Sequence, residues 1–167
     1  MAQEKISFDR FMEAVDVNHH PFIQELHGFF TDNGCKETIE EKKSGLLVSY
    51  KHTKTKKSVA NLLFRKKGLL IRIYGENVGQ YPDFLNTLPD NMVQSIDSAS
   101  ECKRIVHNTC SPKCIGYDVT IRGVRYQKCR YNAFEFLVEH ENYPFIRTFV
   151  ENELNARNAT AAAASKK

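Results

Sequence analysis

The sequence predicts an α+β protein with a mostly antiparallel sheet and helices on one of its faces. Apolar residues recur at helical spacing near both ends of the chain, and they alternate with a period of two in between. The connections between consecutive strand candidates are too short for crossovers between parallel strands. The expected order is therefore two helices, three or four strands, two helices, three strands and one helix.

The helices at the two ends of the chain are predicted from apolar spacing and capping residues. Apolar side chains at positions 8, 11, 12 and 15 follow Ser7, a candidate cap for the first helix. The second helix is expected to begin at Pro21 and to end at Asn33-Gly34, because proline suits a first turn and glycine an end. The last helix is expected to start near Asn142 or Pro144.

A first group of strands is predicted by alternation in the basic part of the chain. Residues 45–53, 58–65 and 68–75 are the expected strands, and residues 36–41 are a short edge strand before them. A hairpin turn is expected at Arg65-Lys66-Lys67-Gly68.

In the second half of the chain, two short helices are expected to begin at Pro82 and Pro89. The cysteine segment that follows is expected to be loop-like, with a turn at Ser111-Pro112. Three further strands are expected in residues 117–121, 124–131 and 133–138, with Arg122-Gly123 as the turn between the first two.

The length of 167 residues fits one domain, which we assign to residues 1–158. Residues 159–167, ATAAAASKK, have low complexity, and we expect them to be disordered or to derive from an expression vector. The chain has no apolar run of about 18 residues, and its first residues lack the apolar core of a signal peptide. We therefore expect a cytoplasmic protein without a membrane partner, in which clustered cysteines serve metal or redox chemistry rather than disulfides.

The cysteines Cys102, Cys110, Cys114 and Cys129 are candidate zinc ligands, with His107 in reserve. If Arg122-Gly123 is a two-residue hairpin loop, Gly116 is level with Cys129, and Cys114 shares a face with Cys129. Two alternatives stay open. The cysteines can be small buried residues, or a thiol can be redox-active or nucleophilic, with Cys110 and His107 as the best dyad.

Positive charge is concentrated in residues 42–75, which contain ten Lys or Arg and no Asp or Glu. Such a surface can bind a phosphate backbone, so nucleic acid is the favoured anionic partner. The expected contacts are Lys51 and Arg72 on the outer face of the sheet and, in loops at strand ends, Lys54, Lys56, Lys57, Lys66 and Lys67. The alternative is a solvated face, since lysines at strand edges and turns also prevent aggregation.

These patterns favour a non-catalytic binding module with a cysteine-bound zinc ion. The nucleophile elbow, the zinc-protease motif and the phosphate-loop motifs are all missing from the sequence, and no acid pair stands out as an acid/base couple. A second hypothesis is a sensor that holds a small apolar or aromatic ligand in a pocket between sheet and helices. A thiol-dependent enzyme is the third.

The segments FRKKGLLIRIYG and AFEFLVEHENYPFIRTFVENEL resemble, in the order of their elements, the small bacterial α+β proteins of the YjbR and YdhG type. The stretch CSPKCIGYDVTIRGVRYQKCRY is similar to a segment of uncharacterised proteins from anaerobic Gram-positive bacteria. The resemblance implies a cytoplasmic bacterial protein with a fold related to the double-wing type, and it implies no activity. It assigns no functional residue.

Overall fold

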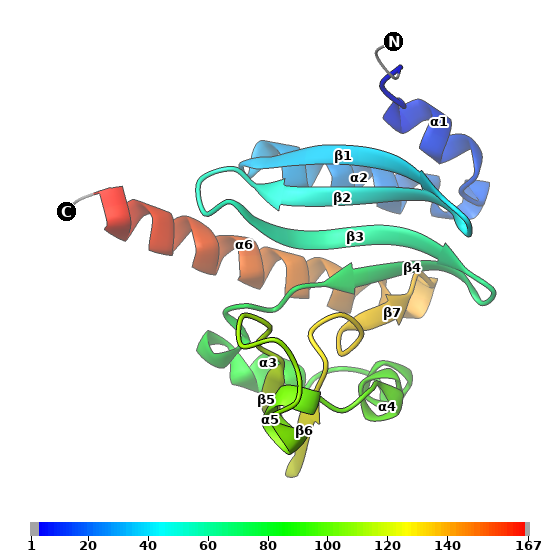
Figure 1. The fold of residues 1–167 in the computed structure, drawn as a ribbon. Coiled ribbons are helices and arrows are strands. Elements are labelled where there is room, and N and C mark those ends of the chain that lie inside the picture. The colour runs from blue at the N-terminus through cyan, green and yellow to red at the C-terminus, as the bar shows by residue number, and fades with distance from the viewer. Residues whose placement is uncertain (1–3, 166–167) are drawn as a thin grey trace.

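The structure is a computed structural model that describes residues 4–165, and it has the predicted α+β class (Figure 1). One sheet contains five antiparallel strands in the order β1-β2-β3-β4-β7, and β5 and β6 form a separate hairpin. The strands are β1 (Cys35–Lys42), β2 (Gly45–His52), β3 (Lys57–Arg65), β4 (Gly68–Ile73), β5 (Tyr117–Ile121), β6 (Val124–Lys128) and β7 (Glu135–Leu137).

The helices of the described residues are α1 (Phe8–Glu13), α2 (His20–Asp32), α3 (Pro82–Leu85), α4 (Asp90–Ser98), α5 (Lys103–His107) and α6 (Tyr143–Ser165). Short 3-10 turns lie at Val17–His19, Val78–Gln80 and His140–Asn142. No helix within residues 4–165 is long and apolar enough to cross a membrane.

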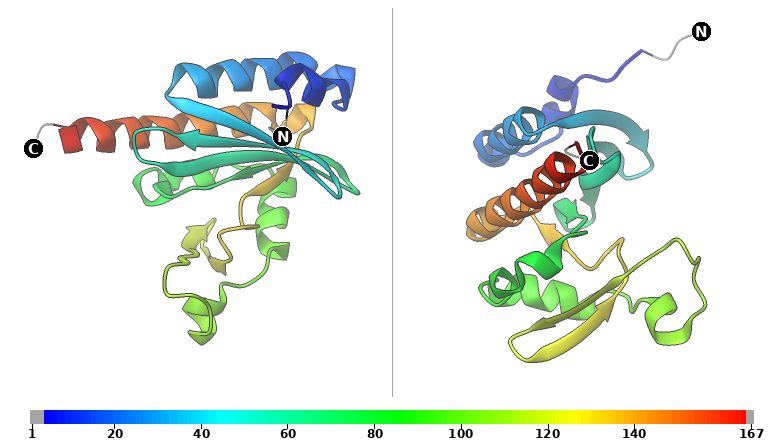
Figure 2. Two further views of the ribbon diagram at one scale, coloured as in Figure 1. Left: turned by 45° about the horizontal axis from the view of Figure 1, so that its top comes forward. Right: turned by 90° about the vertical axis from the view of Figure 1, so that its left-hand side faces the viewer.

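Helices α2 and α6 cover one face of the sheet, as the sequence predicts (Figures 1 and 2). The Phe30 ring of α2 stacks on Tyr50 of β2 with ring centroids 4.1 Å apart, and Phe149 of α6 packs against Phe136 of β7 at 6.3 Å. All four rings are fully buried. The apolar side chains that alternate along the central strands therefore form the core on this face.

The opposite face of the sheet, called the open face below, carries the residues between those core positions. They include Leu47 and Lys51 of β2, Leu63 of β3 and Arg72 of β4. The remaining elements form a second lobe at the β4–β7 edge, which contains α3, α4, α5 and the β5–β6 hairpin (Figure 2). This lobe carries the cysteine segment.

The β5–β6 hairpin has the register predicted from its two-residue turn. Ile121 pairs with Val124, and the ladder continues to Tyr117 opposite Lys128. Arg122 and Gly123 both have positive φ, 51° and 81°, as a tight hairpin turn of this kind requires. Arg122 also donates hydrogen bonds to the Asp90 carboxylate at 2.6 Å and to the Leu88 carbonyl oxygen, which tie the hairpin tip to α4.

Two segments differ from the sequence prediction. The cysteine segment is not entirely loop-like, because Lys103–His107 form the short helix α5, which ends at Asn108 with φ 53°. The low-complexity tail is predicted to be disordered or to derive from an expression vector, and in the structure α6 continues through residues 159–165. Alanine has the highest helix propensity of all residues, so this alanine-rich stretch extends the helix that precedes it. The last two residues of the tail lie outside the described residues.

Candidate functional site

The four predicted zinc ligands lie around one hollow of about 300 Å³ in the second lobe. Cys102 is the N-cap of α5 and is buried, and Cys110 lies exposed in the loop after that helix. Cys114 and Cys129 are half-buried, and Cys129 directly follows β6. The fold thus places thiols from three separate parts of the lobe around one hollow.

Backbone hydrogen bonds hold Cys102 and Cys129 next to each other. The Cys102 amide donates to the Gln127 carbonyl oxygen at 3.0 Å, and the Cys129 amide donates to the Ser100 carbonyl oxygen at 2.8 Å. The Cys102 side chain packs directly over Gly116, where an added Cβ would lie 2.4 Å from the Cys102 sulfur. Only glycine fits at position 116, because any other side chain would displace this cysteine.

The remaining thiols interact with one another. Burial raises the pKa of the Cys114 thiol, and the hydrogen bond with Cys110 and the nearby Cys110 and Cys129 thiols raise it further. The Arg130 guanidinium has the opposite effect on this pKa. These contacts favour the protonated form of the Cys114 thiol.

The thiols share a hollow without forming a finished metal site. Within residues 4–165, no group of three or more His, Cys, Asp or Glu side chains has an arrangement that could hold a metal ion. His107, the reserve ligand, lies in the last turn of α5 and does not line the hollow. It makes no hydrogen bond with Cys110 in the described part of the chain, so the dyad considered from sequence is not assembled. Cys35 lies apart on β1, where burial raises the pKa of its thiol to about 11.

Arg130 also lines this hollow, and the sequence analysis did not identify it. Its guanidinium forms an ion pair with Glu76 at 2.6 Å and lies 5.3 Å from the centre of the Tyr74 ring and 5.9 Å from that of Tyr131. These contacts hold a positive charge beside the thiols. The feature of the sequence that could have identified Arg130 is its position directly after Cys129, one of the predicted zinc ligands.

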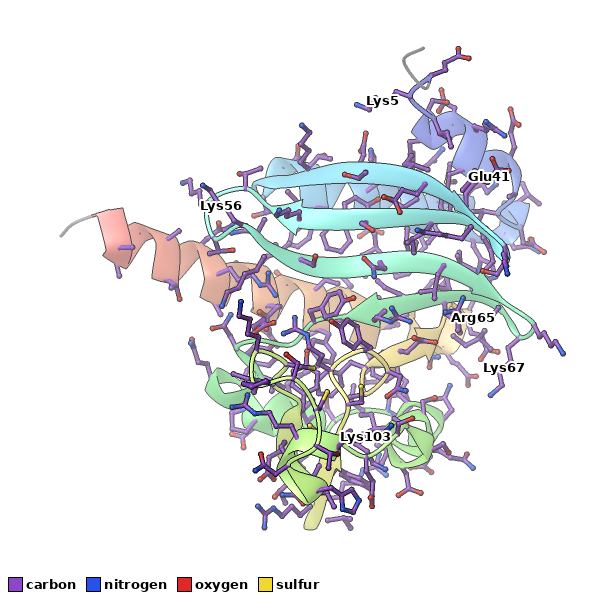
Figure 3. The ribbon with its side chains drawn as sticks, viewed as in Figure 1. Lys5, Glu41, Lys56, Arg65, Lys67 and Lys103 are labelled. Atoms are coloured by element: carbon purple, nitrogen blue, oxygen red, sulfur yellow. The ribbon has the colours of Figure 1, made fainter. Side chains whose placement is uncertain are left out.

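The predicted anion-binding residues form two groups rather than one. Lys54 and Lys56 lie in the β2–β3 turn, close to Lys57 and Lys51, whereas Lys66 and Lys67 lie in the β3–β4 turn. These turns are at opposite ends of the sheet, where Figure 3 labels Lys56 and Lys67. Strand β3 has nine residues, so the groups are about 26 Å apart at about 3.3 Å per residue.

Arg72 lies on the open face between these groups, and its charge is compensated. Its guanidinium contacts the Glu135 carboxylate at 2.9 Å and 3.0 Å, and both side chains are largely buried. Arg72 is therefore a weaker attractor of anions than the sequence suggested.

Another hollow, of about 580 Å³, lies between α4 and the β4–β7 edge of the open face. Leu70 and Leu137 contribute apolar surface to it, and Asn91, Ser95 and Glu135 are among its polar residues. The pocket expected by the sensor hypothesis was apolar and lay between sheet and helices, whereas this hollow is mostly polar.

Comparisons of the chain with protein-family models, with curated proteins and with solved structures found no match. The resemblance to the YjbR and YdhG type stays a prediction.

Proposed function

We propose that this protein is a non-catalytic binding module whose second lobe is fastened by one zinc ion bound to Cys102, Cys110, Cys114 and Cys129. The observation that supports the proposal is that these four thiols line a single hollow. Four cysteines are the complete ligand set of a common structural zinc site, and such sites contain no water ligand. Tetrahedral coordination would require the four sulfur atoms to lie closer together than they do in the structure, because no group of thiols within residues 4–165 is arranged to hold a metal ion.

Charges beside the hollow favour a zinc–thiolate site over isolated thiols. Four thiolates with one Zn²⁺ have a net charge of about −2. Lys103 lines the hollow and would offset part of this charge, whereas the charge of Arg130 is already paired with Glu76. Zinc binds the thiolate and not the thiol, so zinc affinity should increase with pH.

Zinc content is the direct test of this site. Protein purified without a chelator should contain about one zinc atom per chain by elemental analysis. Single substitutions Cys102→Ser, Cys110→Ser, Cys114→Ser and Cys129→Ser should each lower the zinc content, because each removes a ligand. Cys35→Ser is the matched control, since Cys35 lies on β1 outside the hollow, and it should leave zinc content unchanged. A wild-type protein that lacks zinc and fails to bind added zinc would refute the site.

We further propose that the partner is anionic, with nucleic acid as the first choice. The two lysine groups lie at opposite ends of β3, so a phosphate backbone laid along the open face would meet positive charge at both ends. The spacing of about 26 Å, from about 3.3 Å per strand residue, suits an extended chain of several phosphates better than one compact anion.

Retention of nucleic acid at low salt tests the partner. Binding should weaken with salt with a log–log slope of roughly −4 to −5, as expected when about five or six phosphate contacts release counterions. Reversing the charge of Lys56, Lys57, Lys66 and Lys67 together should abolish retention. Reversing the Lys56/Lys57 pair alone or the Lys66/Lys67 pair alone should each remove about half of the slope, because the pairs lie at separate ends. If the wild type is not retained at about 50 mM salt, the anionic-partner proposal is wrong.

A small-molecule sensor is the second candidate, and the hollow beside α4 favours it. Its volume of about 580 Å³ is in the range of ligand pockets. Its many amide, hydroxyl and carboxylate groups suit a polar ligand better than the apolar one first considered. A compound that raises the melting temperature of the wild type but not of Leu137→Arg would support this candidate over the first.

A further inference from the structure

A second positively charged site lies on the open face where the β1–β2 and β3–β4 turns come together. A hollow of about 450 Å³ is lined by Lys42, Lys43, Arg65 and Arg72, with Leu47 and Leu63 as apolar surface. Of these residues, only Arg72 was among the contacts expected for nucleic acid. The hollow is separate from the cysteine lobe and from the lysines of the β2–β3 turn.

The sheet register brings the two turns to the same end. Lys42 pairs with Gly45 where β1 turns into β2, and Arg65 pairs with Gly68 where β3 turns into β4. Figure 3 labels Glu41 and Arg65 at this end of the sheet. A direct contact joins the turns, because the Arg65 guanidinium donates to the Ser44 hydroxyl at 3.3 Å.

The shape of the β1–β2 turn depends on Gly45. Its φ is +127°, and a Cβ at this position would lie 3.1 Å from the Phe64 ring. Glycine therefore allows the turn to pack closely on β3, which holds Lys43 and Ser44 beside Arg65.

Two of the four cations around this hollow are already neutralised. Lys42 contacts the Glu40 carboxylate at 2.9 Å, and Arg72 is paired with Glu135 at 2.9 Å. Lys43 and Arg65 form no ion pair within residues 4–165. Two positive charges are therefore left without an ion-pair partner within these residues. The half-buried Leu47 beside them offers apolar surface, whereas Leu63 is buried beneath the hollow.

We propose that this hollow binds a small phosphate monoester that carries an apolar group. A phosphate monoester has a charge of about −1.5 to −2 at neutral pH, which matches the two free cations. Arginine binds phosphate oxygens in a bidentate manner, and lysine adds a point charge. The apolar group would cover the half-buried Leu47. A phosphodiester backbone fits this site less well, because each of its phosphates carries a single charge and the hollow is confined to one end of the sheet. The inference does not depend on zinc or on nucleic-acid binding.

Titration with phenyl phosphate, followed by amide chemical shifts at about 0.15 M ionic strength, where the Debye length is about 8 Å, tests the inference. We expect a dissociation constant in the low millimolar range, as is usual for a ligand of this size, with the largest shifts at Lys43, Ser44, Leu47 and Leu63. Inorganic phosphate should bind several-fold more weakly, because it lacks the apolar group. The double substitution Lys43→Glu with Arg65→Glu should weaken phenyl phosphate binding by about tenfold or more, the factor expected for each 1.4 kcal/mol of lost interaction.

The double substitution Lys66→Glu with Lys67→Glu is the matched control. It changes the charge equally in the neighbouring turn, but neither side chain lines this hollow, so affinity should stay within about twofold of the wild type.

The neutral pair Lys43→Gln with Arg65→Gln tests the same contacts if the charge reversal disturbs folding. If about 20 mM phenyl phosphate causes no chemical-shift changes, the dissociation constant is well above the low millimolar value expected for a ligand of this size. That result would overturn the inference. Equal weakening by both reversals, or equal affinity for inorganic phosphate, would also overturn it. A failure to retain nucleic acid would not overturn the inference, since nucleic-acid retention also depends on Lys56 and Lys57 at the other end of the sheet.

Discussion

Arg157→Ala is expected to lower the free energy of unfolding by about 3–5 kcal/mol, because it leaves a buried carboxylate without its positive partner. Glu153 is 0% exposed and Arg157 is 2% exposed, and they lie one turn apart on α6 with 2.9 Å between the guanidinium Nε and the carboxylate. The total stability of a domain is about 5–15 kcal/mol, so this loss is large.

The reason for the size of this effect is the complete set of hydrogen bonds around the pair. Glu153 also accepts hydrogen bonds from the Asn77 backbone amide at 3.0 Å, from the Asn77 side chain at 2.9 Å and from the Tyr81 hydroxyl. Arg157 donates to the Lys57 carbonyl oxygen at 3.1 Å and to the Tyr74 carbonyl oxygen at 2.9 Å. The pair therefore ties α6 to the start of β3 and to the chain that leaves β4. Burial raises the pKa of Tyr81, and the charge and hydrogen bond of Glu153 raise it further, so this network keeps the tyrosine protonated.

Arg147→Ala is the matched control for this experiment, since Arg147 is also on α6. Arg147 forms an ion pair with Glu25, and the two side chains are 45% and 53% exposed. Loss of this exposed pair should lower the free energy of unfolding by less than about 1 kcal/mol. Replacing Glu153 and Arg157 together by leucine should cost less than Arg157→Ala alone, because no unpaired charge is then buried. Chemical denaturation measures all four proteins. Similar costs for Arg157→Ala and Arg147→Ala would contradict the prediction.

Removal of zinc is the second change with a large expected effect. Chelation of zinc-loaded protein should strongly increase amide hydrogen exchange across residues 100–131, while β2 and β3 remain protected. If the proposed site is correct, zinc binding energy in this segment is folding energy. The increase should be largest in residues 103–115, since α5 has no buried residue. The β5–β6 hairpin has support of its own, because Tyr117, Ile121 and Tyr126 are buried in the core.

Adding zinc back should restore protection in the wild type but not in Cys114→Ser, which lacks one proposed ligand. Cys35→Ser should behave as the wild type throughout. Exchange that is unchanged by thorough chelation of a zinc-loaded sample would show that zinc does not hold this segment.

Local sequence chemistry determined much of the fold. Alternation located the strands of the main sheet, and prolines located the starts of α3 and α4 within one residue. The Arg122-Gly123 turn determined the β5–β6 register, because a two-residue turn leaves only one way to pair the strands. That register was sufficient to predict that Cys114 and Cys129 lie near each other. Helix α5 was not predicted, because five residues are too few for a periodic pattern.

Only the tertiary structure decided which charges meet. Lys43 and Arg65 are far apart along the chain, and the pairing of β1 to β4 determines that their turns lie side by side. The partner of Arg72 is Glu135, which reaches it because β7 returns to pair with β4. The sequence alone therefore determined the elements and the cysteine hairpin, through local backbone preferences. The free and neutralised charges on the open face depend on long-range strand pairing, which no local pattern encodes.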